Sequence, residues 1–100
     1  MSSNSVTLWD SFRKGDLNAM ESIYRSYYQP LYNYGFQICQ NSDLVRDAIQ
    51  NLFMDLWRRH EHLGPAYDLK FYLFKAIRRQ LIHCMEREKK SVSVDEMLNA

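Results

Sequence analysis

Cations and aromatic rings near the C-terminal end are the residues of this chain best suited to bind a ligand. Residues 69–90 contain seven basic and two acidic side chains, a net charge of +5, whereas the whole chain has a net charge of +1. At helical spacing, one face of this segment carries Tyr72, Lys75, Arg79, His83 and Glu86. Cations attract phosphate groups, and unpaired bases stack on aromatic rings beside cations. This face is a candidate for binding single-stranded nucleic acid. The alternative is a solvated basic surface at the edge of a core.

No group of residues in the sequence has the spacing of a catalytic or metal site. Asp47 and Asp55 are widely spaced carboxylates, with no serine or cysteine beside a base and no glycine-rich phosphate loop. The three histidines lack the partner spacing of a zinc site. Cys39 and Cys84 each lie in a helical pattern that predicts a buried free thiol. We therefore expect a protein without enzymatic activity, bound metal or cofactor.

A second candidate binding surface lies on the stretch from Asp43 to Trp57. Its apolar residues recur with a helical period, which predicts one buried face and one polar face. Met54 is the exception, because it lies in the middle of the polar face among Asp47, Gln50, Asn51 and Asp55. A large apolar side chain in this setting suits a surface that docks on a partner helix. Isolated exposed methionines also occur without a function.

Composition is typical of a small all-α protein. Apolar residues make up 46% of the chain and aromatic residues 14%, which is enough for one modest core. Three glycines and two prolines are few for a turn-rich β fold. No apolar run is long enough to span a membrane, and the first residues lack the pattern of a signal peptide. We expect a compact bundle of four to five helices in a cytoplasmic protein.

Capping residues and glycine divide the first half of the chain into helices. After a flexible start, Ser5 or Thr7 is expected to cap a short helix that ends at Gly15. Asp16 is expected to cap a longer helix. Pro30 predicts either a kink in this helix or a break followed by a new helix.

The second half of the chain contains two helices and one loop. Ser42 or Asp43 is expected to cap the helix with the polar face described above, which should end at about His60. A glycine and a proline give the connection 61–68 a strong turn signal, and Asp68 can cap the last helix.

The last helix is expected to run from Leu69 to about Glu88. Apolar residues at steps of three and four predict the core of the whole bundle. They are Leu8, Trp9 and Phe12; Leu17, Met20, Ile23, Tyr24, Tyr27, Tyr28, Leu31, Tyr34, Gly35, Ile38 and Cys39; Leu44, Val45, Ala48, Ile49, Leu52, Phe53 and Leu56; and Leu69, Leu73, Phe74, Ile77, Leu81, Cys84 and Met85.

Three stretches of the chain, taken in order, resemble one protein family. ESIYRSYYQPLYNYG is similar to the family's L-Y-x-x-Y-x-P-x-L-x-x-x-A helix, DAIQNLFMDLW to E-D-x-x-Q-E-x-F-x-x-x-W, and LKFYLFKAIRRQLIHCMER to Y-L-x-x-I-A-R-N-x-x-x-D-x-x-R. Together they resemble region 2 of the bacterial extracytoplasmic-function sigma factors, over about Phe12 to Glu88. The chain departs from the family pattern at Arg46, Asn51, Arg79 and His83.

The resemblance implies a partner for each of the two candidate surfaces. In this family the polar face of the second stretch docks on the coiled coil of the RNA polymerase β′ subunit. The following loop and last helix recognise the minus-10 promoter element and hold its melted non-template strand, with one base extruded into a pocket. The corresponding residues for polymerase are Asp47, Gln50, Asn51, Met54 and Asp55, and for DNA they are Leu63, Gly64, Tyr67, Tyr72, Lys75, Arg79 and His83.

The resemblance also implies a transcription initiation factor without enzymatic activity. Residues 1–90 would form the region 2 domain, and 91–100 resemble the start of a linker to a second domain that reads the minus-35 element. Because the chain stops before that domain, we expect a truncated protein, and we expect an anti-sigma factor as a further partner. The alternative is a helical protein-interaction module without a nucleic-acid role. Such a module would keep Met54 but would not need Tyr72, Lys75 and Arg79 together.

Overall fold

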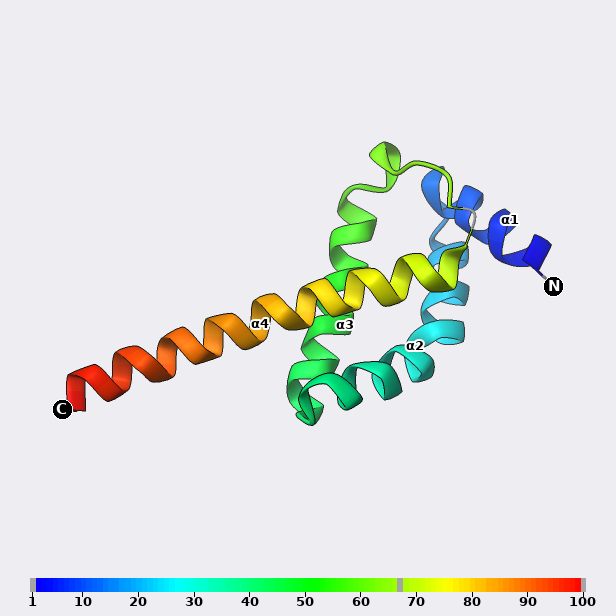
Figure 1. Ribbon diagram of the computed structural model, residues 1–100. Coiled ribbons are helices and arrows are strands. Elements are labelled where there is room, and N and C mark those ends of the chain that lie inside the picture. The colour runs from blue at the N-terminus through cyan, green and yellow to red at the C-terminus, as the bar shows by residue number, and fades with distance from the viewer. Residues whose placement is uncertain (1, 67, 100) are drawn as a thin grey trace.

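The computed structural model describes residues 2–66 and 68–99, with side chains described for residues 7–66 and 68–87. Figure 1 shows α4 lying across α3, and α1 packs beside α2. No strand occurs among the described residues, and the predicted all-α bundle of four to five helices is confirmed. The elements in chain order are α1 (Ser2–Arg13), α2 (Leu17–Cys39), α3 (Ser42–Arg58), the 3₁₀ helix η1 (His60–His62) and α4 (Leu69–Asn99).

Two of the predicted helix caps are confirmed. Asp16 precedes α2, and its carboxylate accepts hydrogen bonds from the backbone N–H groups of Asn18 (2.9 Å) and Ala19 (3.4 Å). Asp68 precedes α4, and its carboxylate accepts a hydrogen bond from the N–H group of Phe71 at 3.0 Å. Each cap satisfies N–H groups that the first turn of a helix leaves unpaired. Both helices therefore begin at the residue after the cap.

The predicted cap of α3 is wrong. Asn41 takes this position instead of Ser42 or Asp43, since its side-chain oxygen accepts a hydrogen bond from the N–H group of Leu44 at 3.1 Å. Ser42 lies inside the helix, where its hydroxyl is 2.6 Å from the hydroxyl of Tyr32 on α2. The sequence offers three neighbouring polar residues at this turn, so sequence alone could not distinguish the cap from its neighbours.

The ends of α1 and α3 differ from prediction by a few residues. α1 begins at Ser2, so Thr7 lies inside the helix, and the side chain of Ser5 lies outside the described residues. The other end of α1 agrees with the prediction, because Gly15 has a φ of +94°, a conformation that favours glycine after a helix. α3 ends at Arg58, and η1 replaces the last expected turn.

α4 is longer than predicted. It continues beyond the expected end at Glu88 as far as Asn99. The sequence 88–99 contains neither glycine nor proline, so no residue in it forces a helix to stop. The domain boundary after residue 90 and the linker at 91–100 stay predictions, since the side chains of 88–100 lie outside the described residues.

α2 remains one helix through Pro30, which decides between the predicted kink and the predicted break. Pro30 has no N–H group to donate to the carbonyl of Ser26, and its ring crowds the preceding turn. Figure 1 shows the axis of α2 changing direction midway along the helix, which is the effect expected of an internal proline. The structure therefore contains the kink.

Apolar residues from all four helices form one core. The prediction is confirmed in full for α3, because all seven of its predicted core residues are buried. In the described part of the chain, no helix combines the length and the apolar content needed to cross a membrane. The buried apolar residues outside α3 are Trp9, Phe12, Ala19, Ile23, Leu31, Leu63, Leu69, Leu73, Ile77 and Leu81.

Two predicted core residues are exposed instead. Leu17 has 63% of its surface exposed, because the buried stripe of α2 begins with Ala19 and continues at steps of four to Ile23. Met85 is exposed because it follows Leu81, which is the last fully buried residue in the described part of α4. Both errors lie at the ends of helical stripes, where the neighbouring helices no longer cover the surface.

Gly35 lies where α2 meets both α3 and α4. A Cβ atom added at this position would lie 3.0 Å from Cγ1 of Val45 and 3.1 Å from Cδ1 of Leu81. Both neighbours are fully buried and belong to different helices. The absence of a side chain at Gly35 is therefore what permits the three helices to pack at their present separation.

We predict that Gly35→Ala lowers the free energy of unfolding by about 1–3 kcal/mol, the usual cost of overpacking a core. Alanine favours a helix over glycine by about 1 kcal/mol, so a loss of stability would come from packing and not from helix propensity. Chemical denaturation followed by circular dichroism measures the change. The matched control is Gly64→Ala, because a Cβ atom at Gly64 meets no atom within 4 Å. Equal stability of the two variants would contradict the close approach.

Candidate functional site

Five polar-face residues of α3, which we call the α3 surface, are the predicted contacts for a protein partner: Asp47, Gln50, Asn51, Met54 and Asp55. Four of them are exposed, and Met54 has 56% of its surface accessible. The side-chain amide of Gln50 donates a hydrogen bond to the hydroxyl of Tyr24 on α2 at 2.7 Å. Gln50 is therefore held in one orientation beside the exposed thioether of Met54.

Asp55 differs from the other members of the α3 surface. Its carboxylate forms an ion pair with Arg59 at 2.7 Å, one helical turn further along the chain. Both side chains line a cavity of about 260 Å³ between α3 and α4. Asp55 thus faces the neighbouring helix and is only half exposed, whereas Asp47 projects freely into solvent.

The cavity between α3 and α4 is lined by residues of both predicted surfaces, Asp55 from one and three residues of α4 from the other. Three of its lining residues, Tyr72, Lys75 and Arg79, were predicted to bind DNA. Arg59, which is not among the predicted site residues, adds a further cation. Its spacing of four residues from Asp55 indicates an ion pair, but sequence spacing alone could not show that the pair lies beside α4.

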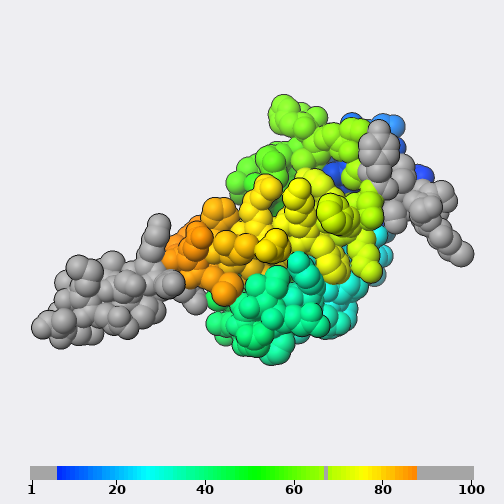
Figure 2. All heavy atoms as spheres, viewed as in Figure 1, coloured from blue at the N-terminus to red at the C-terminus, as the bar shows by residue number. Residues whose placement is uncertain are grey.

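The predicted basic face of α4, which we call the α4 surface, comprises Tyr72, Lys75, Arg79 and His83. Figure 2 shows α4 exposed along one face of the molecule, between the side chains of α2 and those of α3 and η1. A second cavity of about 250 Å³ lies on this helix, and its lining contains three cations but no carboxylate. The residues that line it are Lys75, Arg78, Arg79, Ile82 and His83.

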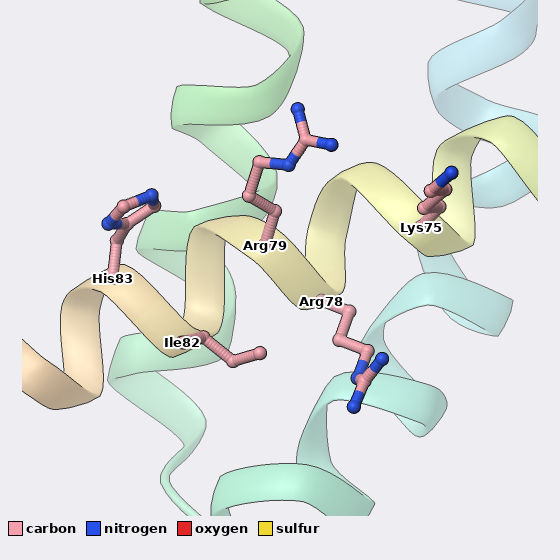
Figure 3. A pocket seen from close by; sticks show the side chains of 5 residues that line it. All are labelled: Lys75, Arg78, Arg79, Ile82 and His83. Carbon is pink, nitrogen blue, oxygen red and sulfur yellow. The ribbon is translucent and has the colours of Figure 1, made fainter.

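Side chains leave α4 in two directions around this second cavity. Figure 3 shows Arg79 and His83 projecting to one side of the helix, and Arg78 and Ile82 projecting to the other. Arg78 and Ile82 were not among the predicted site residues. Arg78 belongs to the basic segment and could have been found from its charge. Ile82 is an exposed apolar residue beside polar ones, so the reasoning that selected Met54 could also have found it.

Tyr72 is both part of the α4 surface and part of the packing beneath it. Its ring is 5.3 Å from the ring of Trp9 on α1, in a tilted arrangement. The residue is half-buried, and it also lines the cavity between α3 and α4. Tyr72 therefore stabilises the edge of the core and leaves part of its ring accessible.

The three loop residues predicted to contact DNA occupy different environments. Leu63 is buried in the core, with 9% of its surface exposed, so its side chain supports the loop from inside. Gly64 is exposed, with open space where a side chain would be. Tyr67 lies outside the described residues. Of the two predicted loop residues that the structure describes, Gly64 is thus accessible and Leu63 is not.

Cys39 and Cys84 are free thiols, and both are half-buried rather than fully buried as predicted. Among the side chains that the structure describes, no three His, Cys, Asp or Glu residues lie close enough together to hold a metal ion. The α3 surface offers an exposed methionine, side-chain amides and two carboxylates, and the α4 surface offers positive charge.

Comparison with known families gives a match to Sigma-70 region 2 over residues 23–91. This range contains the α3 surface, the α4 surface and the loop between them, but α1 lies outside it. No curated protein and no solved structure matches the chain significantly.

We predict that Tyr72→Ala lowers the free energy of unfolding by about 1–3 kcal/mol, because the contact with Trp9 is lost. Tyr72→Phe keeps the ring and should leave the stability within about 0.5 kcal/mol of the parent protein. Thermal and chemical denaturation measure both changes. The neighbouring exposed residue supplies a control, Phe71→Ala, with little expected effect. An equally stable Tyr72→Ala variant would show that the ring does not contribute to the core.

Proposed function

The chain belongs to the sigma-70 region 2 family, and from this premise we propose that it is the region 2 domain of an extracytoplasmic-function sigma factor. Membership assigns it a role in transcription initiation, with core RNA polymerase and promoter DNA as partners. The proposal adds which surface meets which partner. The observation that carries it is the presence of two chemically different exposed surfaces on adjacent helices, both inside the matched range.

The α3 surface suits a protein partner. Its centre is an exposed methionine, a flexible apolar side chain that adapts to the surface it contacts. Exposed polar groups surround it, and one of them, Gln50, is already oriented by Tyr24. A small apolar anchor inside a polar rim is the usual composition of a protein interface. We assign the coiled coil of the polymerase β′ subunit to this surface, as the resemblance implies.

The α4 surface suits single-stranded DNA. Lys75, Arg78 and Arg79 supply positive charge beside a cavity without carboxylates, and the accessible part of Tyr72 supplies a ring for stacking. Phosphate contacts of this kind fix the position of a strand, whereas bases are distinguished by contacts to their edges. We assign the non-template strand of the minus-10 element to this surface and to the backbone around Gly64.

The alternative function, a protein-interaction module without a nucleic-acid role, explains less of the structure. It accounts for Met54 but not for three cations around a cavity that contains no acidic residue. The family match favours transcription initiation over this alternative. An anti-sigma factor as a further partner and a cytoplasmic location stay predictions.

We predict that Met54→Asp weakens binding to a fragment of the β′ coiled coil by ten- to a hundredfold. The substitution replaces the apolar anchor with a charge that must lose its hydration on binding, a loss of about 1.4–3 kcal/mol for a central interface residue. Isothermal titration calorimetry measures the affinity.

The matched control for Met54→Asp is Met85→Asp, which makes the same chemical change at an exposed methionine on α4. It should leave the affinity for the coiled coil within about twofold, since it lies on another helix. Equal affinities for Met54→Asp and the parent protein would remove the α3 surface as the polymerase contact.

We predict that Lys75→Glu and Arg79→Glu each weaken binding to single-stranded DNA oligonucleotides and reduce its dependence on salt. Each lost phosphate contact lowers the slope of log affinity against log salt concentration by about 0.7. Fluorescence anisotropy at several salt concentrations measures both quantities. The control is Arg25→Glu, which reverses an exposed charge on α2 that pairs with Glu21. If all three variants change binding equally, the effect comes from net charge and not from the α4 surface.

A further inference from the structure

α1 lies outside the residues that match the family, yet it holds the loop that follows η1. The side chain of Arg13 donates a hydrogen bond from Nε to the carbonyl of Leu63 at 2.8 Å. The indole of Trp9 donates from Nε1 to the carbonyl of Gly64 at 2.9 Å. Two consecutive carbonyl groups of the loop are thus bound by side chains from a helix fifty residues earlier in the chain.

Contacts with residues outside the loop hold both donor side chains in place. Trp9 has 2% of its surface exposed, and its ring packs between Phe12 at 5.4 Å and Tyr72 at 5.3 Å. The guanidinium of Arg13 is held by Asp10, which accepts from Nη1 at 3.1 Å. A donor that is already oriented loses little conformational entropy when it binds its acceptor. These two hydrogen bonds can therefore select one loop conformation.

The loop itself has few other means of holding its shape. Gly64 and Pro65 are exposed. Glycine is the most flexible residue, and proline has a fixed φ but no N–H group to donate to a hydrogen bond. The side chain of Leu63 is buried and fixes one end of the loop. The conformation at Gly64 and Pro65 is thus held by Leu63 and Ala66, which contact the core, and by the hydrogen bonds from α1.

α1 also contacts the elements on both sides of the loop. On one side, Phe12 packs edge-on against Trp57 at 5.9 Å, and Trp57 stacks on His60 of η1 at 4.6 Å. On the other side, Trp9 packs against Tyr72 of α4. α1 therefore contacts the elements before and after the loop, and these contacts set the position of the loop relative to the α4 surface.

We propose that Trp9 and Arg13 are positioning residues that fix residues 63–66 relative to the α4 surface and so determine which base the loop accepts. This inference rests on the proposed function, because it concerns the same contact with single-stranded DNA. Cations on α4 supply affinity without reading the sequence, whereas base selection requires a loop of defined shape. Release of the loop should therefore reduce discrimination between bases more than it reduces affinity.

The test uses Trp9→Phe, which keeps an aromatic ring but loses the indole N–H, and Arg13→Met, which keeps the aliphatic stem but loses the guanidinium. Hydrogen exchange of the backbone amides in residues 60–68, measured on the whole protein in the absence of DNA, reports the conformation of the loop. Loss of one hydrogen bond should accelerate exchange there by roughly three- to tenfold. The control is Arg25→Met, an exposed arginine on α2 that should leave this exchange unchanged.

The second measurement compares affinities for four oligo(dT) 12-mers that carry dA, dC, dG or dT at one central position. We expect the parent protein and Arg25→Met to discriminate between the four strands, and Trp9→Phe and Arg13→Met to lose most of that discrimination. Coiled-coil affinity and the melting temperature show whether each variant remains folded. A merely structural role would change these two quantities and leave the ratio of the four DNA affinities unaltered.

Each result separates the inference from the proposed function. Unchanged exchange in both α1 variants would overturn the anchoring of the loop. Faster exchange with unchanged base discrimination would overturn the positioning role, while loss of binding in Lys75→Glu would still support the proposed function. A parent protein that binds none of the four strands would overturn the DNA-binding function and the positioning role together, and exchange would still decide whether α1 anchors the loop.

Discussion

The packing of α3 between α2 and α4 is the constraint on which the rest of the structure depends. Every residue of its apolar face is buried, so this helix cannot rotate without exposing a large part of the core. Its polar face is thereby fixed toward solvent, with Met54 at its centre. The same packing places α4 beside the C-terminal end of α3, where Asp55 and Arg59 line a cavity together with residues of α4. One buried face thus determines the position of both candidate surfaces.

Helical periodicity predicted most of this arrangement, because burial of α3 and of the centre of α4 follows directly from the spacing of apolar residues. Predictions were weakest at the ends of elements. Leu17 and Met85 continue an apolar stripe but lie beyond the helices that would cover them. Asn41 caps α3 while its neighbour Ser42 contacts Tyr32 on α2, and a local capping rule ranks these neighbouring polar residues almost equally.

The sequence indicated the chemistry of the candidate site better than its geometry. Charge and aromatic content identified the face of α4, and a misplaced methionine identified the face of α3. By contrast, the burial of Leu63 and the presence of Arg59 beside α4 depend on how distant segments pack. The hydrogen bonds from Trp9 and Arg13 end on backbone carbonyls, which every residue possesses, so the sequence of the loop carries no signal for them.

The chain of aromatic contacts from Trp9 through Phe12 to Trp57 and His60 has a consequence for spectroscopy. The protein contains two tryptophans, and both take part in this series of ring contacts at the junction of α1, η1 and α4. Neither lies in the contact around Gly35, where α2 meets α3 and α4. Intrinsic tryptophan emission therefore reports on the junction beside the loop and not on the contact around Gly35. The native protein thus carries its own optical probe of the region where Trp9 contacts the loop.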